Sequence, residues 1–179
     1  MTYDYIVVGA GIAGCALAYE LARCGSVCSL EADSRPGFHA TDRSVALYAP
    51  SYGGREIRAP TLASRAFFDH PPAGFAAHPL LRQRGVLHIA RTYQLIRLTQ
   101  MADGIRESGG RVSLISQQES IAQVPLLRRE YVAGAACDSD AMDIDVDALQ
   151  RGFLRTARAH GAVLMTHTHV TEIERRQGQ

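Results

Sequence analysis

The sequence predicts an α/β fold: a Rossmann-like domain at the start of the chain, and part of an α+β domain after it. Three observations support this prediction. A short apolar run stops at a glycine-rich turn, a segment of good helix formers follows, and a second apolar run ends in an acidic residue. Together they form a strand–helix–strand unit within residues 3–31. Such units have parallel strands and a right-handed crossover.

Each element of this unit has its own local signal. Tyr3–Val8 is β-branched and aromatic, as expected of a buried strand. Ile12–Cys24 is rich in Ala and Leu, and Gly25 stands where a helix C-cap glycine belongs. Val27–Leu30 is the second strand, and Glu31 follows it directly. The unit therefore places an acidic side chain at the carboxyl end of its second strand.

The rest of the chain is less regular, and 33–43 is expected to be a loop. Helices are expected at 44–49 with Ser44 as N-cap, 55–68, 92–107 with Thr92 as N-cap, from the capping box Ser116–Glu119, and from Asp145 or Asp147 to about Ala159. Strands are expected at 85–90, 111–115, 131–137, 162–166 and 170–175, with a hairpin turn at 175–179.

Composition excludes several classes of protein. With 179 residues, 46% hydrophobic and 21% charged, the chain suits one globular domain or one domain plus part of another. Its net charge of +1 favours neither nucleic acid nor an anionic membrane as a partner. All nineteen basic residues are Arg, so neither a Schiff-base lysine nor a P-loop lysine is available.

The N-terminal region does not look like a targeting segment. Its longest uncharged run, Tyr5–Tyr19, is too short to span a bilayer, and Asp4 rather than a basic segment precedes it. We therefore expect no signal peptide, no stable membrane span and a cytoplasmic location.

No metal site is predicted. The acidic run 138–147 lacks the glycine and the terminal glutamate of an EF-hand loop, so helix capping is the favoured interpretation. His167 and His169 lack an evident third ligand. The four cysteines fit no CxxC or zinc spacing and are expected to be buried thiols.

Gly9, Gly11 and Gly14 form a GxGxxG motif between the first strand and the helix. In this context Gly9 permits a tight turn, Gly11 lets the backbone approach a pyrophosphate, and Gly14 lets helix and strand pack closely. Glu31 lies seventeen residues past Gly14, where a carboxylate binds a ribose 2′-hydroxyl and repels a 2′-phosphate. The motif allows FAD or NAD and disfavours NADP. The alternative is a glycine-rich turn in an α/β protein that binds no nucleotide.

The segment Pro36–Ser44, with the pattern P-G-x-H-x-T-x-R-S, narrows the choice. With this motif and the stretches 63–75, 78–81, 124–129 and 143–149, the chain resembles the D-amino-acid oxidase superfamily of FAD-dependent oxidoreductases, and within it the bacterial D-arginine dehydrogenases. The resemblance implies FAD as cofactor and an amino acid as small-molecule substrate. It implies hydride transfer from Cα to the flavin, giving an imino acid that hydrolyses to a keto acid and ammonia. The electron acceptor stays open.

The resemblance also implies roles for single residues. Besides the three glycines, the residues expected at the cofactor are Ala13, Glu31, Ala32, Thr41, Arg43, Ser44, Val45, Ala46, Leu47 and Val170. Tyr52 and Val86 are expected at the substrate, and no residue is assigned to the chemical step itself.

Two positions depart from the D-arginine enzymes. Leu47 stands where those enzymes have a histidine near the flavin, and Val86 stands near their substrate-binding glutamate. Without that carboxylate a guanidinium would lose its charge partner. The expected substrate is therefore neutral or apolar.

The resemblance implies a longer, two-domain protein. We expect residues 1–80 in the FAD-binding domain, 81–140 at the start of the substrate domain, and 141–179 back in the FAD-binding domain. We expect the chain to be an N-terminal part and to be inactive alone. Two alternatives stay open: a flavin-binding remnant without turnover, and a superfamily member acting on glycine, sarcosine or a 2-hydroxy acid.

Overall fold

The computed structural model describes residues 2–175, which divide into two compact units. Unit 1 consists of 1–45, 71–80 and 145–179, and unit 2 of 46–70 and 81–144. Residues 46–70, expected within the first domain, thus group with 81–144. The assignment of cofactor and substrate domains to these units stays a prediction, and the hairpin expected at 175–179 lies outside the described residues, apart from Arg175.

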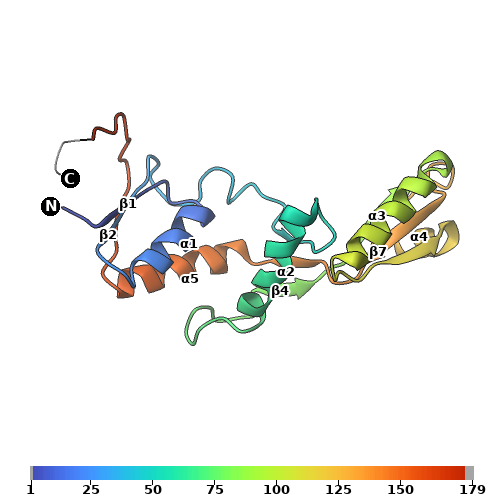
Figure 1. Cartoon of the computed structure of the whole chain (residues 1–179), viewed down its shortest axis with the longest axis horizontal. Helices are drawn as coiled ribbons and strands as arrows, with labels where there is room; N and C mark the ends of the chain where they lie inside the picture. Colours follow the sequence, from blue (N-terminus) through green and yellow to red (C-terminus); the bar gives the residue numbers. More distant parts are fainter. Residues whose placement is uncertain (1, 176–179) are drawn as a thin grey trace. The chain divides into compact units, whose positions relative to one another are not determined.

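Unit 1 is built on a parallel sheet of β1 (Tyr5–Val8), β2 (Val27–Leu30) and β9 (Val163–Met165), in the order β1-β2-β9. Helices α1 (Ile12–Leu21) and α5 (Val146–Ala159) lie side by side next to it (Figure 1). A cluster of small apolar side chains joins sheet and helices: Val7, Ala18, Ala22, Val27 and Ala157. The predicted strand–helix–strand unit is confirmed, with α1 ending at Leu21 rather than Cys24.

Aromatic rings fill the other side of α1 and α5. Tyr19 and Phe153 meet the ring of Phe75 at centroid distances of 6.1 and 5.1 Å, both nearly perpendicular. Phe75 is 2% exposed, although it comes from the short excursion 71–80. Asp145, one of the two candidates, caps α5 by accepting the N–H of Ala148 at 2.8 Å. The last segments of unit 1 are therefore held against its first helix.

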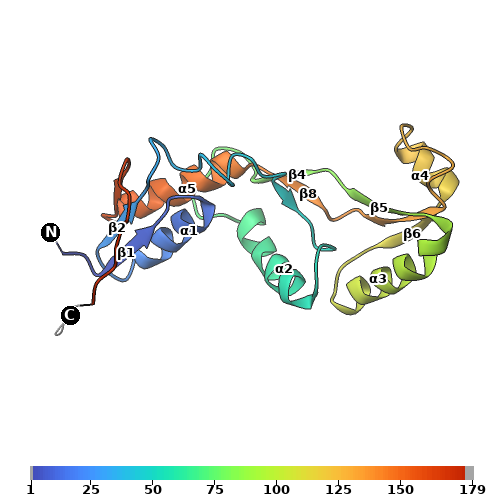
Figure 2. The same cartoon turned by 90° about the horizontal axis from the view of Figure 1, so that it is seen from above.

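Unit 2 contains two antiparallel sheets. The larger has the order β5-β7-β6, from β5 (Val86–Ala90), β7 (Gly134–Asp138) and β6 (Ser113–Ser116). Helix α3 (Leu95–Glu107) packs on it through Leu98, Ala102 and Ile105 (Figure 2). The smaller sheet, β3-β8-β4, joins Leu47–Tyr48, Met142–Ile144 and Leu81–Gln83. Helices α2 (Arg55–Asp69) and α4 (Gln117–Gln123) complete the unit, and the capping box at Ser116 is confirmed.

Three expected elements differ in the structure. The helix at 44–49 is wrong: Ala46 has φ +48°, which a right-handed helix does not permit, and Leu47 starts β3. Thr92 does not cap α3, because Thr92–Gln94 forms a 3₁₀ turn before it. No strand forms over 170–175.

Within residues 2–175, no helix combines the length and the apolar composition that a membrane span requires. No group of three His, Cys, Asp or Glu side chains there is placed to hold a metal ion. Cys15 and Cys28 are buried, but Cys24 is exposed, which corrects the expectation of four buried thiols.

Two helical glycines should respond oppositely to alanine. Glycine inside a helix costs about 1 kcal/mol relative to alanine. At Gly104 in α3 an added Cβ would meet only an Arg58 nitrogen, at 4.0 Å, so Gly104→Ala should raise the melting temperature. At Gly152 in α5 the Cβ would overlap the buried Phe75 ring, so Gly152→Ala should destabilise by about 1–3 kcal/mol. Calorimetry of both variants checks this, and stabilisation by Gly152→Ala would contradict the packing.

Candidate cofactor site

The glycine motif forms a tight turn between β1 and α1. Gly9 has φ +92°, and its N–H donates to the Leu30 carbonyl at 2.8 Å. A Cβ on Gly14 would overlap the carbonyl oxygen of Gly9. Only glycine therefore lets α1 start this close to the end of β1.

The start of α1 presents backbone N–H groups. The first intrahelical bond runs from the Cys15 N–H to the Gly11 carbonyl at 2.9 Å, so the N–H groups of Ile12, Ala13 and Gly14 precede the ladder. The Ile12 N–H donates to the Thr41 hydroxyl oxygen at 3.0 Å. The first turn carries no acidic side chain. This helix end therefore has the geometry and potential to bind an anion.

Glu31 lies directly beside the glycine turn. It is 8% exposed, and its Oε2 accepts the Ala10 N–H at 2.8 Å while Oε1 accepts the Asp33 N–H at 3.0 Å. A carboxylate offers about four acceptor positions. Two backbone donors thus orient Glu31 and leave it acceptor capacity for ribose hydroxyls. Ala32 follows it and is partly buried.

The segment 41–45 touches the turn at its first residue. Thr41 is buried, and its carbonyl accepts the Ser44 hydroxyl at 3.2 Å. The Arg43 guanidinium lies 5.5 Å from the centre of the Phe38 ring, and Val45 is 80% exposed. The structure therefore brings Thr41 to the glycine motif, whereas Arg43 and Val45 face outward.

Val170 follows a segment, residues 167–168, that is hydrogen-bonded to the backbone at Glu31 and Asp33. The Thr168 N–H donates to the Glu31 carbonyl at 2.8 Å, and the His167 N–H donates to the Asp33 carbonyl at 3.0 Å. Val170 itself is 38% exposed. The structure therefore brings the segment that precedes Val170 to the acidic residue.

Sequence reasoning missed two buried residues behind the turn. The Gln150 Nε2 on α5 donates to the Ala10 carbonyl at 2.8 Å and lies 3.7 Å from the Cys15 sulfur. The Cys15 thiol donates to the same carbonyl at 3.2 Å, and burial raises its pKa. Gln150 is 140 residues from Ala10 and belongs to no motif, so no local pattern marks it.

In unit 2 one carboxylate connects the segments of two predicted substrate residues. Asp138 is 1% exposed, pairs with Val86 across β5 and β7, and accepts the Ser51 N–H at 3.2 Å. Tyr52 follows Ser51 and is 66% exposed. The structure therefore ties the backbone beside Tyr52 to the strand pair that carries Val86.

Two further contacts lie near these segments of unit 2, one at Ser51 and one at Leu47. The Ser51 hydroxyl lies 3.0 Å from His88 Nε2, a contact that the sequence did not suggest. Leu47 pairs with Asp143 at the edge of the smaller sheet, directly after the positive-φ Ala46.

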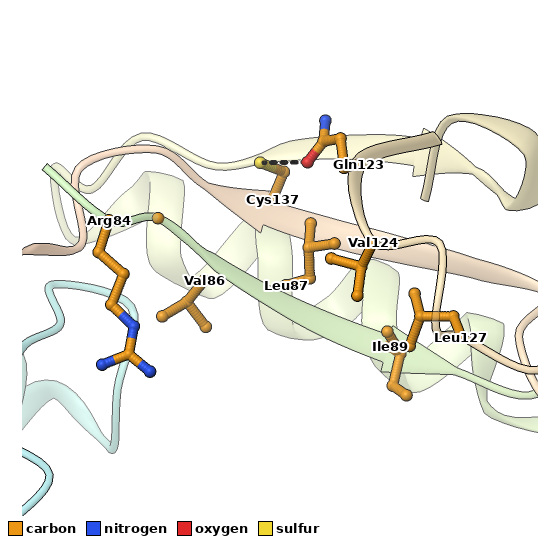
Figure 3. A pocket seen from close by; sticks show the side chains of 9 residues that line it. Arg84, Val86, Leu87, Ile89, Gln123, Val124, Leu127 and Cys137 are labelled. Carbon is orange, nitrogen blue, oxygen red and sulfur yellow. Dashed lines mark hydrogen bonds between the residues drawn. The ribbon is translucent and has the colours of Figure 1, made fainter. Parts of the chain in front are cut away.

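A cavity of about 460 Å³ lies beside β5 in unit 2 (Figure 3). Leu87 and Val124 point toward one another there, and Ile89 lies beside Leu127. Val86 lies at the rim, where Arg84 is paired with Asp143 at 2.8 Å. The lining is mainly apolar, and its one cation already has a carboxylate partner.

Comparison with known proteins agrees with the glycine turn and the acidic residue. Residues 4–179 match the DAO family, described as FAD dependent oxidoreductase. Among curated proteins, one subunit of the anaerobic glycerol-3-phosphate dehydrogenase of Yersinia pseudotuberculosis serotype I (strain IP32953) is 29% identical over 105 residues, 59% of this chain and 22% of that protein.

Solved structures share the fold along nearly the whole chain. L-α-glycerophosphate oxidase from Mycoplasma pneumoniae, with FAD bound, has a TM-score of 0.86 at 16% identity, covering 99% of this chain and 48% of that one. Glycine oxidase from Bacillus cereus ATCC 14579 has 0.81 at 21%, covering 98% and 49%, and L-proline dehydrogenase from P. horikoshii has 0.83 at 21%, covering 97% and 46%. The chain spans about half the length of these structures, and its matched part covers 22% of the curated relative. With the family match over 4–179, it belongs to the DAO family of FAD-dependent oxidoreductases, and FAD is its cofactor.

Proposed function

We propose that the protein oxidises the Cα–N bond of a D-amino acid with a neutral side chain, using FAD, to an imino acid that water converts to a keto acid and ammonia. The observation that carries the substrate proposal is Val86. This apolar residue stands where the D-arginine enzymes, which the sequence resembles, have their carboxylate, and it lies at the rim of a mainly apolar cavity. Glycine oxidase and L-proline dehydrogenase among the structural relatives are named for amino-acid oxidation.

The cofactor would be held mainly by the backbone of the glycine turn. The N–H groups of Gly11, Ala13 and Gly14 would face the pyrophosphate, with Gly9 shaping the turn. Glu31 and Ala32 would lie at the adenosine ribose, and Val170 near the adenine. Further contacts along pyrophosphate and flavin are proposed for Thr41, Arg43, Ser44, Val45, Ala46 and Leu47.

The residues present fit this group. A Cβ built on Gly11 would meet only the Thr41 hydroxyl oxygen within 4 Å, at 3.3 Å, so the phosphate side of the turn is open. The Glu31 carboxylate is hydrogen-bonded directly to the same turn, through the Ala10 N–H. Ala46, the strained residue of the 41–47 segment, has φ +48°, and such strain is commonly kept at cofactor-binding positions.

Binding and orientation are what these residues contribute to catalysis. FAD supplies the two-electron acceptor when bound. The start of α1 fixes the phosphates, Glu31 fixes the ribose, and together they set the position of the cofactor along the chain. Val86 and the apolar cavity wall would exclude water and cationic groups from the substrate side chain. No residue of this chain is proposed to move a proton.

A second candidate is oxidation of a hydroxyl group. The curated relative and one structural relative are named for glycerol phosphates. A phosphate needs cationic partners, and Arg84 in the cavity rim is already paired with Asp143. Assays of D-amino acids, glycine, sarcosine, glycerol 3-phosphate and 2-hydroxy acids with an artificial electron acceptor separate the two reactions.

Replacing Gly11 or Gly14 by alanine should have different effects on FAD affinity and on stability. Gly11→Ala requires a shift of a few tenths of an ångström at Thr41, so the protein should fold and lose at least about tenfold in FAD affinity, because the methyl group enters phosphate space. Gly14→Ala meets the Gly9 backbone and should lower the melting temperature as well. Fluorescence titration of FAD and thermal unfolding measure both effects. Unchanged FAD affinity in Gly11→Ala would refute the pyrophosphate assignment.

Glu31→Gln should weaken FAD by about 1–3 kcal/mol, the scale of a lost charged hydrogen bond. Its amide would turn a donor toward either the Ala10 or the Asp33 N–H, both of which now donate to Glu31. Asp33→Asn is the matched control, since it removes a nearby charge and leaves both acceptors of Glu31 in place. If the two variants lose FAD equally, the ribose assignment fails.

The protein should prefer D-leucine, D-methionine or D-phenylalanine to D-arginine in kcat/KM. Val86→Glu should raise kcat/KM for D-arginine about tenfold relative to Val86→Gln, because only the carboxylate pairs with the guanidinium. Steady-state kinetics on the whole protein decides the matter. A higher kcat/KM for D-arginine than for the neutral substrates in the unmodified protein overturns the substrate proposal.

A further inference from the structure

The peptide between Ala10 and Gly11 is held from behind by a side chain outside the glycine motif. The Gln150 Nε2 on α5 donates to the Ala10 carbonyl at 2.8 Å, and Gln150 is 6% exposed. On the other side of the same residue, the Ala10 N–H donates to Glu31 at 2.8 Å. Ala10 is fully buried, so its backbone polar groups depend on side chains: the N–H on Glu31, and the carbonyl on Gln150 together with the Cys15 thiol, which donates to it at 3.2 Å.

A trans peptide links this contact to the phosphate side. The carbonyl of Ala10 and the N–H of Gly11 belong to one planar unit and point in opposite directions. Because Gln150 draws the carbonyl inward, toward α5, the Gly11 N–H turns outward. A rotated peptide would point a carbonyl oxygen toward the phosphate and repel it.

The other end of the same carboxamide touches the second cofactor segment. A Cβ on Gly37 would lie 2.5 Å from Gln150 Oε1, so this glycine lets the 36–42 turn close over the side chain. Gly37 has φ +80°, and its carbonyl accepts the Asp42 N–H at 3.0 Å. Thr41, in this turn, accepts the Ile12 N–H. Gln150 therefore lies between the two segments that meet at the start of α1.

We propose that Gln150 is a positioning residue for the FAD pyrophosphate: its amide holds the Ala10 carbonyl inward and thereby aims the Gly11 N–H at the phosphate. The proposal rests on the assignment of Gly11 to the pyrophosphate. Its effect should depend on the ligand's phosphates and not on its ribose or adenine.

The test compares ADP and adenosine as competitors of FAD on the deflavinated whole protein. Gln150→Met keeps the length and removes the donor, and Gln150→Leu is a second replacement if the first folds poorly. Either should weaken ADP about tenfold and change adenosine by less than about twofold. Glu31→Gln should instead weaken both ligands alike. Gln117→Leu is the matched control, since Gln117 donates to the Arg129 and Val132 carbonyls at 2.8 and 2.6 Å in unit 2; it should lower stability without changing ADP affinity.

The outcomes separate the two assignments. Loss of ADP affinity in both Gly11→Ala and the Gln150 variants, with adenosine unchanged, supports the proposal. Loss in Gly11→Ala alone overturns the role of Gln150 and leaves the pyrophosphate assignment standing. Unchanged ADP affinity in Gly11→Ala overturns the pyrophosphate assignment and the proposal with it. An equal loss of ADP and adenosine affinity in the Gln150 variants overturns the proposal alone.

Discussion

The close approach of α1 to the end of β1 is the constraint on which the rest of unit 1 depends. Gly14 has no room for a Cβ against the Gly9 carbonyl, and Gly9 takes a positive φ to make the turn. The approach buries the backbone of Ala10, which cannot reach water. Buried N–H and C=O groups need partners, and an unsatisfied one costs about 1–3 kcal/mol. Glu31 is the partner of the N–H, and Gln150 and the Cys15 thiol are the partners of the carbonyl, so a steric constraint determines where these side chains lie.

What the sequence predicts well is local. The capping box at Ser116 and the cap at Asp145 depend on residues within a few positions of one another, and the strand–helix–strand unit pairs strands only 22 residues apart. The elements that it missed are non-local. The two residues of β3 are strand because they pair with 142–143, and β4 because it pairs with 142–144. Segments of two or three residues carry no periodicity, so only their distant partner identifies them.

The same distinction applies within the site. The motif predicts where the glycines and Glu31 lie, because its spacing reflects the single strand–helix–strand unit that contains them. Thr41 was expected at the cofactor by resemblance, but its bond to the Ile12 N–H, which satisfies one of the unpaired donors at the start of α1, is visible only in the structure. Arg43 is expected at the cofactor by the same resemblance, and its contact with the Phe38 ring is likewise visible only in the structure. A resemblance names positions, whereas burial and partners are decided by the fold.

Gln150 shows how far the motif depends on the rest of the chain. Unit 1 is interrupted twice, and α5 returns to it only after residue 144. This helix nevertheless supplies the donor to Ala10, the glycine that faces Phe75 and a core alanine beside α1. Within α1 the Ala10 carbonyl has only the Cys15 thiol as a side-chain donor, and it acquires the Gln150 amide when residues 145–159 dock. The hydrogen-bonded environment of the glycine turn, to which a side chain 140 residues away contributes, is therefore a property of the assembled unit and not of the motif alone.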